Sequence, residues 1–312
     1  MRTVIRYAFW LLSLFLMSEI QAVTPQKAPL KLGAERMDVV TRLLKDKQVG
    51  LVVNQTSILE KQQKHLLDAL LEEGINIKKV FAPEHGFRGT ADAGEHVASS
   101  VDERTGVPIR SLYDGRTRRP SDEAMRSFDV LLVDMQDVGL RFYTYYISML
   151  RMMDACADFG RAVVVLDRPN PNGSYIDGPV LDMKYKSGVG ALPIPVVHGL
   201  TMGEIARMAV GEGWAKPCDL TVVPCRRYTH ATRYELPVAP SPNLPTQRSI
   251  YLYPSICLFE GTVVSLGRGT DRSSVTAIPT CRPTATASSS RRGRQPARNI
   301  LLWKDAYVAV ST

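Results

Sequence analysis

The feature that most constrains the fold is an alternation of short, predominantly apolar segments with helical patterns. The segments predicted to be strands are residues 49–53, 75–82, 129–133, 161–166 and 220–223. Between them, leucines at helical spacing from Lys61 to Glu73 and a stretch from Tyr143 to Phe159 predict helices. Strands that are apolar throughout are buried on both faces, which is typical of a parallel sheet. We therefore predict an α/β fold, a Rossmann-like, mostly parallel sheet with helices on both faces.

Capping residues mark where several predicted helices begin. Ser121 precedes a short helix, and Thr201 with Glu204 forms a capping-box pattern that opens a helix running to Val210. Neither GxGxxG nor GxxxxGK[ST] follows any predicted strand. The fold therefore does not imply a bound dinucleotide.

Four of the predicted strands end in polar or ionisable side chains. The endings are Asn54-Gln55, Glu84-His85, the segment from Asp134 to Asp137, and the segment from Asp167 to Asn170. Because the carboxyl ends of parallel strands lie along one edge of a sheet, these side chains are expected at the edge where open α/β folds bind ligands. A single such ending is usually a helix cap, whereas four together favour a polar binding site.

The segment 81–96 is the most prominent of these endings. An apolar strand gives way to Glu84, His85, Glu95 and His96 among three glycines. Glycine allows the backbone to turn sharply or to approach a ligand closely. A functional loop is the favoured interpretation, and a solvated charged turn is the alternative.

The net charge of +8 does not indicate a nucleic-acid partner, because it is concentrated at the ends of the chain. From Arg272 onward six arginines and one lysine stand against one acidic residue, a net charge of +6, and the first 22 residues carry +1. Subtracting both from +8 leaves +1 for residues 23–271. This nearly neutral body gives no reason to expect nucleic-acid binding.

The first 22 residues are predicted to be a secretory signal peptide. Arg2 and Arg6 form a basic start, an apolar core runs from Ala8 to Met17, and Ala22 ends a plausible cleavage site. No later segment reaches about 18 apolar residues, so no stable membrane span is expected after cleavage, although a membrane-anchored N-terminus is an alternative. We expect an exported bacterial protein, periplasmic or extracellular.

The remainder of the chain divides at Asp271. Residues 23–271 are expected to form the Rossmann-like domain. Residues 272–312 are rich in Arg, Ser, Thr and Pro, with almost no apolar periodicity before Leu301. A segment of this composition buries too little apolar surface to order itself. We predict a disordered or aberrant tail there, such as a frameshift would produce.

The five cysteines show no spacing typical of metal ligands. Cys218 and Cys225 could form a disulfide in an oxidising compartment, and buried free thiols are the alternative. Nothing in their surroundings suggests a cysteine nucleophile.

Five motifs occur in a fixed order between about Leu43 and Asp271. They are residues 84–89 (EHGFRG), 134–145 (DMQDVGLRFYTY), 167–171 (DRPNP), 241–246 (SPNLPT) and 259–262 (FEGT). In these motifs the chain resembles the bacterial exo-β-N-acetylmuramidases of NamZ type. The resemblance implies a Rossmann-like catalytic domain followed by an auxiliary domain, which is expected to be missing here because the likeness ends just after Asp271. It also implies hydrolysis of terminal β-1,4-linked N-acetylmuramic acid from peptidoglycan fragments, with no metal or organic cofactor.

Glycoside hydrolysis usually needs two carboxyl groups that flank the scissile oxygen, one of them a general acid. Glu84 is the first candidate because it directly follows the end of an apolar strand, and His85 is expected to orient it or to bind the sugar. Glu260 is the second candidate because the glycine after it allows close approach. Asp134 and Asp137 are held in reserve for this role.

Further residues of these motifs are assigned to the substrate, which would be a peptidoglycan-derived muropeptide or a MurNAc-GlcNAc saccharide. The lactyl carboxylate needs a cation, and amide side chains suit acetamido and hydroxyl groups. Tyr143 and its aromatic neighbours suit stacking on a sugar ring, although tyrosines at this spacing could equally belong to the core. The substrate-binding candidates are Arg88, Asp134, Gln136, Asp137, Arg141, Tyr143, Arg168, Asn170, His198, Asn243 and Arg268.

Two other functions compete with this interpretation. A metal hydrolase could use Glu84-His85 and Glu95-His96 with Asp92 and His198, but their spacing matches no compact metal-binding motif. A non-catalytic muropeptide-binding protein, or an inactive truncated remnant, is the other alternative. Activity assayed with a chelator, and sugar binding without product, would separate these possibilities.

Overall fold

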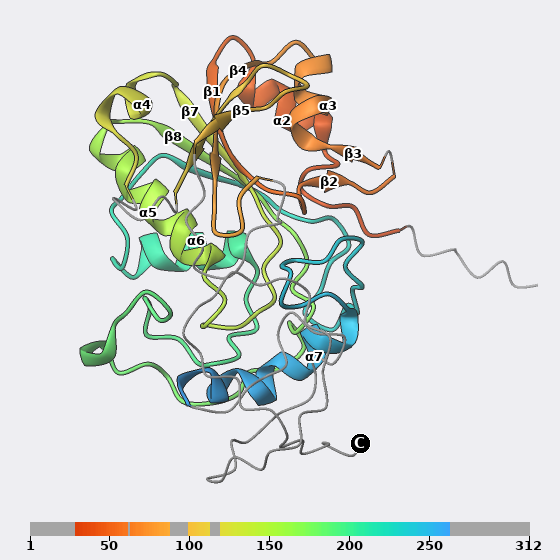
Figure 1. The fold of residues 1–312 in the computed structure, drawn as a ribbon, viewed down its shortest axis with the longest axis vertical. Coiled ribbons are helices and arrows are strands. Elements are labelled where there is room, and N and C mark those ends of the chain that lie inside the picture. Colours follow the sequence, from red (N-terminus) through yellow and green to blue (C-terminus); the bar gives the residue numbers. More distant parts are fainter. Residues whose placement is uncertain (1–28, 62, 88–98, 113–118, 263–312) are drawn as a thin grey trace, which may run out of the picture. The chain divides into compact units, whose positions relative to one another are not determined.

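The computed structural model describes residues 29–61, 63–87, 99–112 and 119–262, and the elements below belong to one compact unit that begins at Lys31. Its centre is a seven-stranded sheet in the order β5-β6-β4-β1-β7-β8-β9 (Figure 1). Every neighbouring pair is parallel except β5 and β6. The strands are β1 (Gln48–Val53), β4 (Asn76–Ala82), β5 (Ser100–Val101), β6 (Pro108–Ser111), β7 (Val130–Asp134), β8 (Ala162–Leu166) and β9 (Leu220–Val223).

Helices cover both faces of this sheet. On one face α2 (Met37–Leu44) and α3 (Leu66–Glu72) bury Val40 and Leu70 in an apolar cluster that contains Leu51 of β1. On the other face α4 (Asp122–Arg126), α5 (Tyr145–Asp158) and α6 (Met202–Gly211) bury their apolar side chains in a cluster that contains Val52 and Val133. Successive strand residues thus point into different clusters, which confirms the predicted two-faced α/β fold.

Local capping residues fix where the helices begin. Ser121 Oγ accepts a hydrogen bond from the Ala124 N–H at 3.2 Å at the start of α4. At α6, Thr201 Oγ1 accepts from the Glu204 N–H at 3.2 Å, and Glu204 Oε2 accepts from the Thr201 N–H at 2.8 Å. Both predicted helix starts are therefore confirmed, the second as a complete capping box.

The predicted helix start at Lys61 is wrong. Lys64–His65 forms a short strand, β3, that pairs with β2 (Ile58–Leu59) in an antiparallel hairpin. His65 then caps α3, because its Nδ1 accepts a hydrogen bond from the Leu67 N–H at 3.2 Å. The leucine spacing correctly indicated a helix, but the hairpin moves its start to Leu66.

The strand order contains one reversal of direction. From β1 the chain moves outward to β4 and β6 and then returns to the other side of β1, where it continues through β7, β8 and β9. Open α/β folds bind ligands at such a reversal, beyond the carboxyl ends of the strands. The reversal lies between β1 and β7, which directs attention to Asn54 and to the segment from Asp134 to Asp137.

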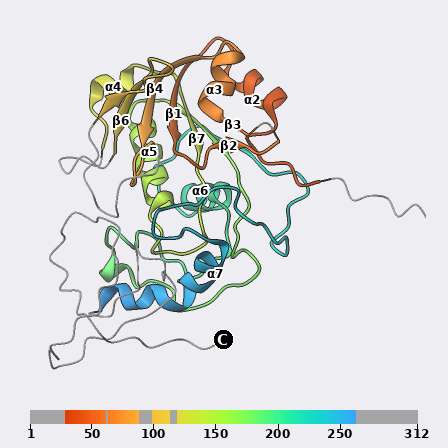
Figure 2. The same ribbon diagram turned by 45° about the vertical axis from the view of Figure 1, so that its right-hand side comes forward.

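The C-terminal described elements are α7 (Gln247–Ile256) and a 3₁₀ helix, η2 (Cys257–Gly261). They lie on the side of the loops that follow β7 and β8, where a further 3₁₀ helix, η1 (Met183–Tyr185), is found (Figure 2). Asn172, in the loop after β8, contacts α7 by donating from Nδ2 to the Ile250 carbonyl at 3.3 Å. In the described ranges, no helix is both long and apolar enough to cross a membrane.

The cysteines with described positions are free thiols. They are Cys156, Cys218, Cys225 and Cys257. Of the two sequence-based alternatives for Cys218 and Cys225, the structure has free thiols rather than a disulfide. Cys281, the predicted signal peptide and the predicted tail lie outside the described residues.

Candidate active site

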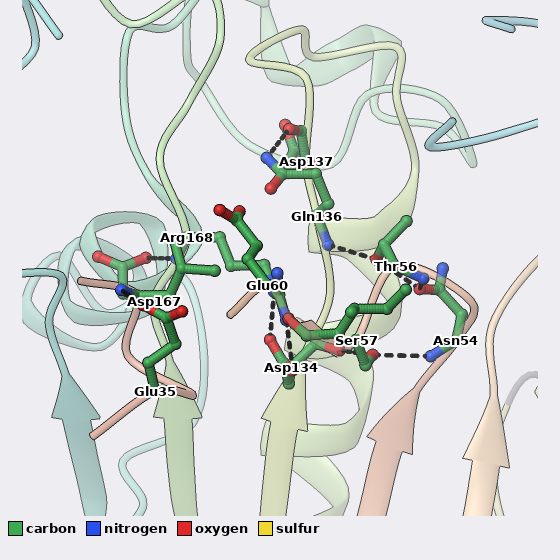
Figure 3. A network of polar contacts seen from close by, with 12 residues as sticks. Glu35, Asn54, Thr56, Ser57, Glu60, Asp134, Gln136, Asp137, Asp167 and Arg168 are labelled. Carbon is green, nitrogen blue, oxygen red and sulfur yellow. Dashed lines mark hydrogen bonds and ion pairs between the residues drawn. The ribbon is translucent and has the colours of Figure 1, made fainter. Parts of the chain in front are cut away.

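The polar endings of four neighbouring strands share one edge of the sheet. The strands β4, β1, β7 and β8 stand side by side, so the residues that follow them meet at their carboxyl ends. Figure 3 shows Asn54, Asp134, Asp137 and Arg168 gathered beyond the strand tips. The hydrogen bonds divide this edge into two parts. In the closed part the charged atoms bind one another, and in the open part some buried polar atoms have no partner among the described residues.

Asp134 and Arg168 form the closed part (Figure 3). Arg168 donates from Nε to Asp134 Oδ1 at 2.5 Å and from Nη2 to Oδ2 at 2.8 Å, and both side chains are buried. Arg168 Nη2 also donates to the Ile58 carbonyl at 3.1 Å. Burial alone would lower the pKa of Arg168, but the Asp134 carboxylate raises it above its usual value. Both charged groups are thus engaged within the protein.

Asp137 lies farther along the same loop, and its surroundings are different. Oδ1 accepts a hydrogen bond from the Gly139 N–H at 2.7 Å and lies 3.8 Å from His198 Nε2. Among the described residues, neither Asp137 Oδ2 nor His198 Nε2 has a hydrogen-bond partner, although both atoms are buried. Burial raises the pKa of Asp137 to about 7 and lowers the pKa of His198 to about 4. At neutral pH this is a neutral imidazole beside a carboxyl group that titrates.

Pairing between two loops holds Asp137 against His198. The His198 N–H donates to the Gly139 carbonyl at 3.2 Å, and the Arg141 N–H donates to the Val196 carbonyl at 2.8 Å. Gly139 has a φ of +82°, and a Cβ there would lie 2.3 Å from Asn170 Oδ1. Glycine is therefore required at 139 both for its backbone conformation and for close packing.

Glu84 follows β4 after one proline and is half-buried. The Thr144 hydroxyl donates to Glu84 Oε2 at 2.7 Å, and the Tyr145 hydroxyl oxygen lies 3.4 Å from the Glu84 carbonyl oxygen. Burial raises the pKa of the Tyr145 phenol, and the carboxylates of Glu84 and Asp137 add to this increase. His85 is buried and has a φ of +71°.

Several other predicted substrate-binding residues donate side-chain hydrogen bonds to backbone carbonyls. Gln136 donates from Nε2 to the carbonyls of Asp137 and Pro169, at 2.7 and 2.8 Å. Asn170 donates to the Leu200 carbonyl at 2.9 Å. Arg141 donates from Nη1 to the carbonyls of Pro179 and Ile194 at 2.8 and 2.6 Å. These contacts fix the loops around Asp137, and a role in substrate binding stays a prediction.

The remaining predicted residues lie towards the C-terminal part. The hydroxyls of Tyr143 and Tyr145 both donate to the Pro240 carbonyl, at 2.8 and 3.1 Å, and Asn243 is partly exposed in the same loop. Glu260 is exposed on η2. The proposed pairing of Glu84 with Glu260 is neither supported nor contradicted by a described contact. Arg88 and Arg268, like Glu95 and His96, lie outside the described residues.

Thr144 and Asp167 also take part in this edge, although no role was predicted for either. Thr144 orients the Glu84 side chain, and Asp167 accepts from Thr201 Oγ1 at 2.7 Å and from the Gly203 N–H at 2.9 Å. Burial raises the pKa of Asp167 to about 6. The position of Asp167 after an apolar strand was a signal for a helix cap, but no local signal joins Thr144 to Glu84. Within the described ranges, no group of three or more His, Cys, Asp or Glu side chains is placed to hold a metal ion.

Comparison with known proteins connects this arrangement to one family. The model for the N-terminal region of the exo-beta-N-acetylmuramidase NamZ matches residues 49–248, and the model for its C-terminal region matches residues 251–290. The peptidoglycan beta-N-acetylmuramidase NamZ of Bacillus subtilis (strain 168) is 44% identical over 235 residues, which cover 73% of this chain and 56% of that protein. The chain therefore spans about half the length of this curated relative.

Two crystal structures of DUF1343 family proteins from Bacteroides fragilis NCTC 9343 share the fold. One has a TM-score of 0.74 and 53% sequence identity, covering 85% of this chain and 71% of that chain. The other has a TM-score of 0.73 and 33% identity, covering 81% of this chain and 66% of that chain. Together, the matched family models and the identity to the Bacillus protein show that this chain belongs to the exo-beta-N-acetylmuramidase NamZ family.

Proposed function

We propose that this chain is an exo-acting glycoside hydrolase that releases terminal β-1,4-linked N-acetylmuramic acid from peptidoglycan fragments. The observation that carries the proposal is the Glu84 carboxyl group, which Thr144 orients at the ligand-binding edge of the sheet. The activity named for the Bacillus relative supports the choice of substrate. The corresponding biological role is cell-wall turnover and recycling of muropeptides, in an exported, periplasmic or extracellular protein.

In this proposal Glu84 is the general acid. Hydrolysis of a glycosidic bond needs a proton on the leaving oxygen, because an alkoxide is a poor leaving group. The Thr144 hydroxyl binds Glu84 Oε2 at 2.7 Å and so restricts the rotation of the carboxyl group. Holding a catalytic group in one orientation lowers the entropic part of the barrier.

The test is hydrolysis of two substrates by the wild-type chain and by Glu84→Gln. On a MurNAc-GlcNAc disaccharide, Glu84→Gln is expected to lower kcat by on the order of 10²–10⁴-fold, which is the usual contribution of general acid catalysis. On a dinitrophenyl β-N-acetylmuramide the loss is expected to be much smaller, because this leaving group needs no proton. Glu123→Gln, an exposed residue of α4, is the matched control and should behave as wild type.

Each possible result decides between functions. Normal turnover of the disaccharide by Glu84→Gln would remove Glu84 from the acid role. Equilibrium binding of N-acetylmuramic acid without any hydrolysis by the wild-type chain would instead favour the non-catalytic binding protein. Loss of turnover on addition of a chelator would favour the metal hydrolase.

A further inference from the structure

Asp137 and His198 face each other at the sheet edge with buried atoms that lack partners. Within the described part of the chain, Asp137 Oδ2 and His198 Nε2 accept or donate no hydrogen bond, and the two side chains are almost completely buried. A buried polar atom without a partner destabilises the folded protein, so it calls for an explanation such as a catalytic role or a bound water or ion. The second atom of each side chain is used by the protein itself, which fixes both orientations.

The hydrogen bonds of the imidazole determine where its proton lies. The Leu200 N–H donates to His198 Nδ1 at 3.1 Å, so the neutral ring carries its proton on Nε2. That N–H faces Asp137 Oδ1 at 3.8 Å, while the Gly139 N–H binds the same oxygen at 2.7 Å. The Gly139 N–H therefore occupies Oδ1, the His198 N–H lies beyond hydrogen-bond distance of the same oxygen, and Oδ2 is the oxygen left for chemistry.

The other candidates for a second carboxyl group are less suitable. Both oxygens of Asp134 are held by Arg168 at 2.5 and 2.8 Å, so Asp134 cannot exchange a proton without breaking a buried ion pair. Glu260 is exposed on η2 in the part of the chain that the structure describes, whereas a reacting carboxyl group is usually shielded from bulk water. Asp137 is instead almost completely buried, and its Oδ2 has no partner among the described residues.

We propose that Asp137 is the second carboxyl group of the hydrolysis and acts as its general base, with His198 as its positioning residue. This inference rests on the proposed glycosidase function. Glu84 gives its proton to the glycosidic oxygen as the bond from that oxygen to the anomeric carbon breaks. A water oxygen forms the new bond to the anomeric carbon, and a proton of that water passes to Asp137 Oδ2. One proton leaves Glu84 and one arrives at Asp137, and solvent restores both groups. Attack by water opposite the leaving group inverts the anomeric configuration.

The protonation of Asp137 is expected to determine how the rate of hydrolysis depends on pH, because its neighbours do not change charge near pH 7. His198 lies 3.8 Å from Asp137, and the Asp137 carboxylate adds to the raised pKa of the phenols of Tyr143, Tyr145 and Tyr146. Burial raises the pKa of all three phenols and lowers the pKa of His198 to about 4, so these groups stay neutral near pH 7. Burial places the pKa of Asp137 at about 7, which suits a general base at neutral pH.

The test uses the full chain with Asp137→Asn and the dinitrophenyl β-N-acetylmuramide. Asp137→Asn is expected to lower kcat by on the order of 10²–10⁴-fold on this substrate as well as on the disaccharide, because a good leaving group does not replace a base. The wild-type kcat is expected to fall at low pH as Asp137 is protonated, and we call this fall the acidic limb of the pH profile. It should disappear in Asp137→Asn. NMR of the first product formed should show the inverted anomer.

His198 needs a readout that a purely structural role would not change. His198→Phe removes the donor that faces Asp137, so the acidic limb is expected to move to higher pH while KM changes little. His198→Gln restores a donor and should move the limb back. Asp137→Ala is the control for misfolding. Added azide or formate should recover its turnover, and this recovery is possible only if the variant is folded.

The outcomes separate this inference from the function on which it rests. An active wild-type chain with an equally active Asp137→Asn, or a product with retained configuration, would overturn the role of Asp137 and leave the glycosidase intact. A folded wild-type chain that hydrolyses neither substrate would overturn both. Loss of activity in Asp137→Asn together with an unchanged acidic limb would also contradict the assignment, because another group would then titrate.

Discussion

Two buried aspartates at the end of β7 have opposite surroundings. Asp134 has both carboxyl oxygens bound by Arg168, whose guanidinium is also held by the Ile58 carbonyl. Asp137 is bound through Oδ1 by the Gly139 N–H, and its Oδ2 has no partner in the ranges that the structure describes. The two residues share a strand end, a residue type and almost complete burial.

The difference indicates that partners, and not burial alone, decide whether a buried carboxyl group is held in one charge state. A carboxylate with two charge-assisted hydrogen bonds keeps one ionisation state and holds neighbouring strands together. A buried carboxyl group without such a partner has a raised pKa and can exchange a proton near neutral pH. This contrast is why we propose Asp137, and not Asp134, as the carboxyl group that takes part in the chemistry.

Breaking the pair of Asp134 and Arg168 is expected to have the largest effect on stability. Arg168→Met leaves Asp134 buried without its cation, and losing one partner of a buried ion pair typically costs about 3–5 kcal/mol. The free energy of unfolding, measured with urea at pH 7, should fall by this amount.

Removing the Asp134 charge as well tests why Arg168→Met loses stability. Adding Asp134→Asn to Arg168→Met should recover much of the stability, because no buried charge then remains unpaired. A loss below about 1 kcal/mol in Arg168→Met would show that Asp134 is not confined to the ion pair in solution, and the comparison would fail.

Asp137→Asn is expected to change stability in the opposite direction. The pKa of Asp137 is raised from 3.8 to about 7, so the folded state binds a proton more readily than the unfolded state between these values. The contribution of Asp137 to stability therefore falls as the pH rises through this window, by up to roughly 4 kcal/mol. Asp137→Asn removes this penalty, and we expect roughly 2–4 kcal/mol of added stability at pH 8 and little change at pH 4.

Two other buried groups titrate in the same range, so the measurement is the difference between the wild-type and variant curves. Asp167 acts in the same direction as Asp137, because burial raises its pKa to about 6. His198 acts in the opposite direction, since its pKa is lowered to about 4 and its contribution is lost as the pH falls from about 6.5. Asp122→Asn, exposed on α4, should leave the curve unchanged. Equal loss of stability in Asp137→Asn at pH 4 and pH 8 would contradict the assignment.

The fold could be predicted from the sequence because its signals are local. Uninterrupted apolar strands indicate a parallel sheet, and Ser121 and Thr201 mark helix starts through contacts within three residues. The hairpin of β2 and β3 was missed because two-residue strands carry no periodic pattern.

The candidate site could be predicted only as a set of positions at one edge. The sequence places Asp134 and Asp137 in one motif, but the partner of Asp134 comes from the end of β8 and the neighbour of Asp137 from a loop before α6. Their different roles depend on these long-range contacts, which no spacing reveals. The contact between Thr144 and Glu84 is of the same kind.

The smallest predicted effect concerns Thr201, which binds Asp167, a third buried carboxyl group at this edge whose two oxygens, like those of Asp134, both have partners. Its hydroxyl accepts from the Glu204 N–H at 3.2 Å and donates to Asp167 Oδ2 at 2.7 Å. Thr201→Ala removes the cap of α6 and one donor to a buried carboxylate, for an expected loss of about 1–2 kcal/mol in the free energy of unfolding. Thr201→Ser keeps the hydroxyl and should recover most of it.

Turnover per folded molecule is the decisive readout for Thr201. If carboxyl groups whose two oxygens both have partners only support the fold, Thr201→Ala should hydrolyse the muramide at the wild-type rate at a temperature where both proteins are fully folded. Circular dichroism would establish that the compared samples are folded. A change in the acidic limb of its pH profile would instead connect Asp167 to the chemistry, because loss of the Thr201 donor raises the pKa of that carboxyl group further. The separation between a closed, structural part and an open, reactive part of the edge would then not hold.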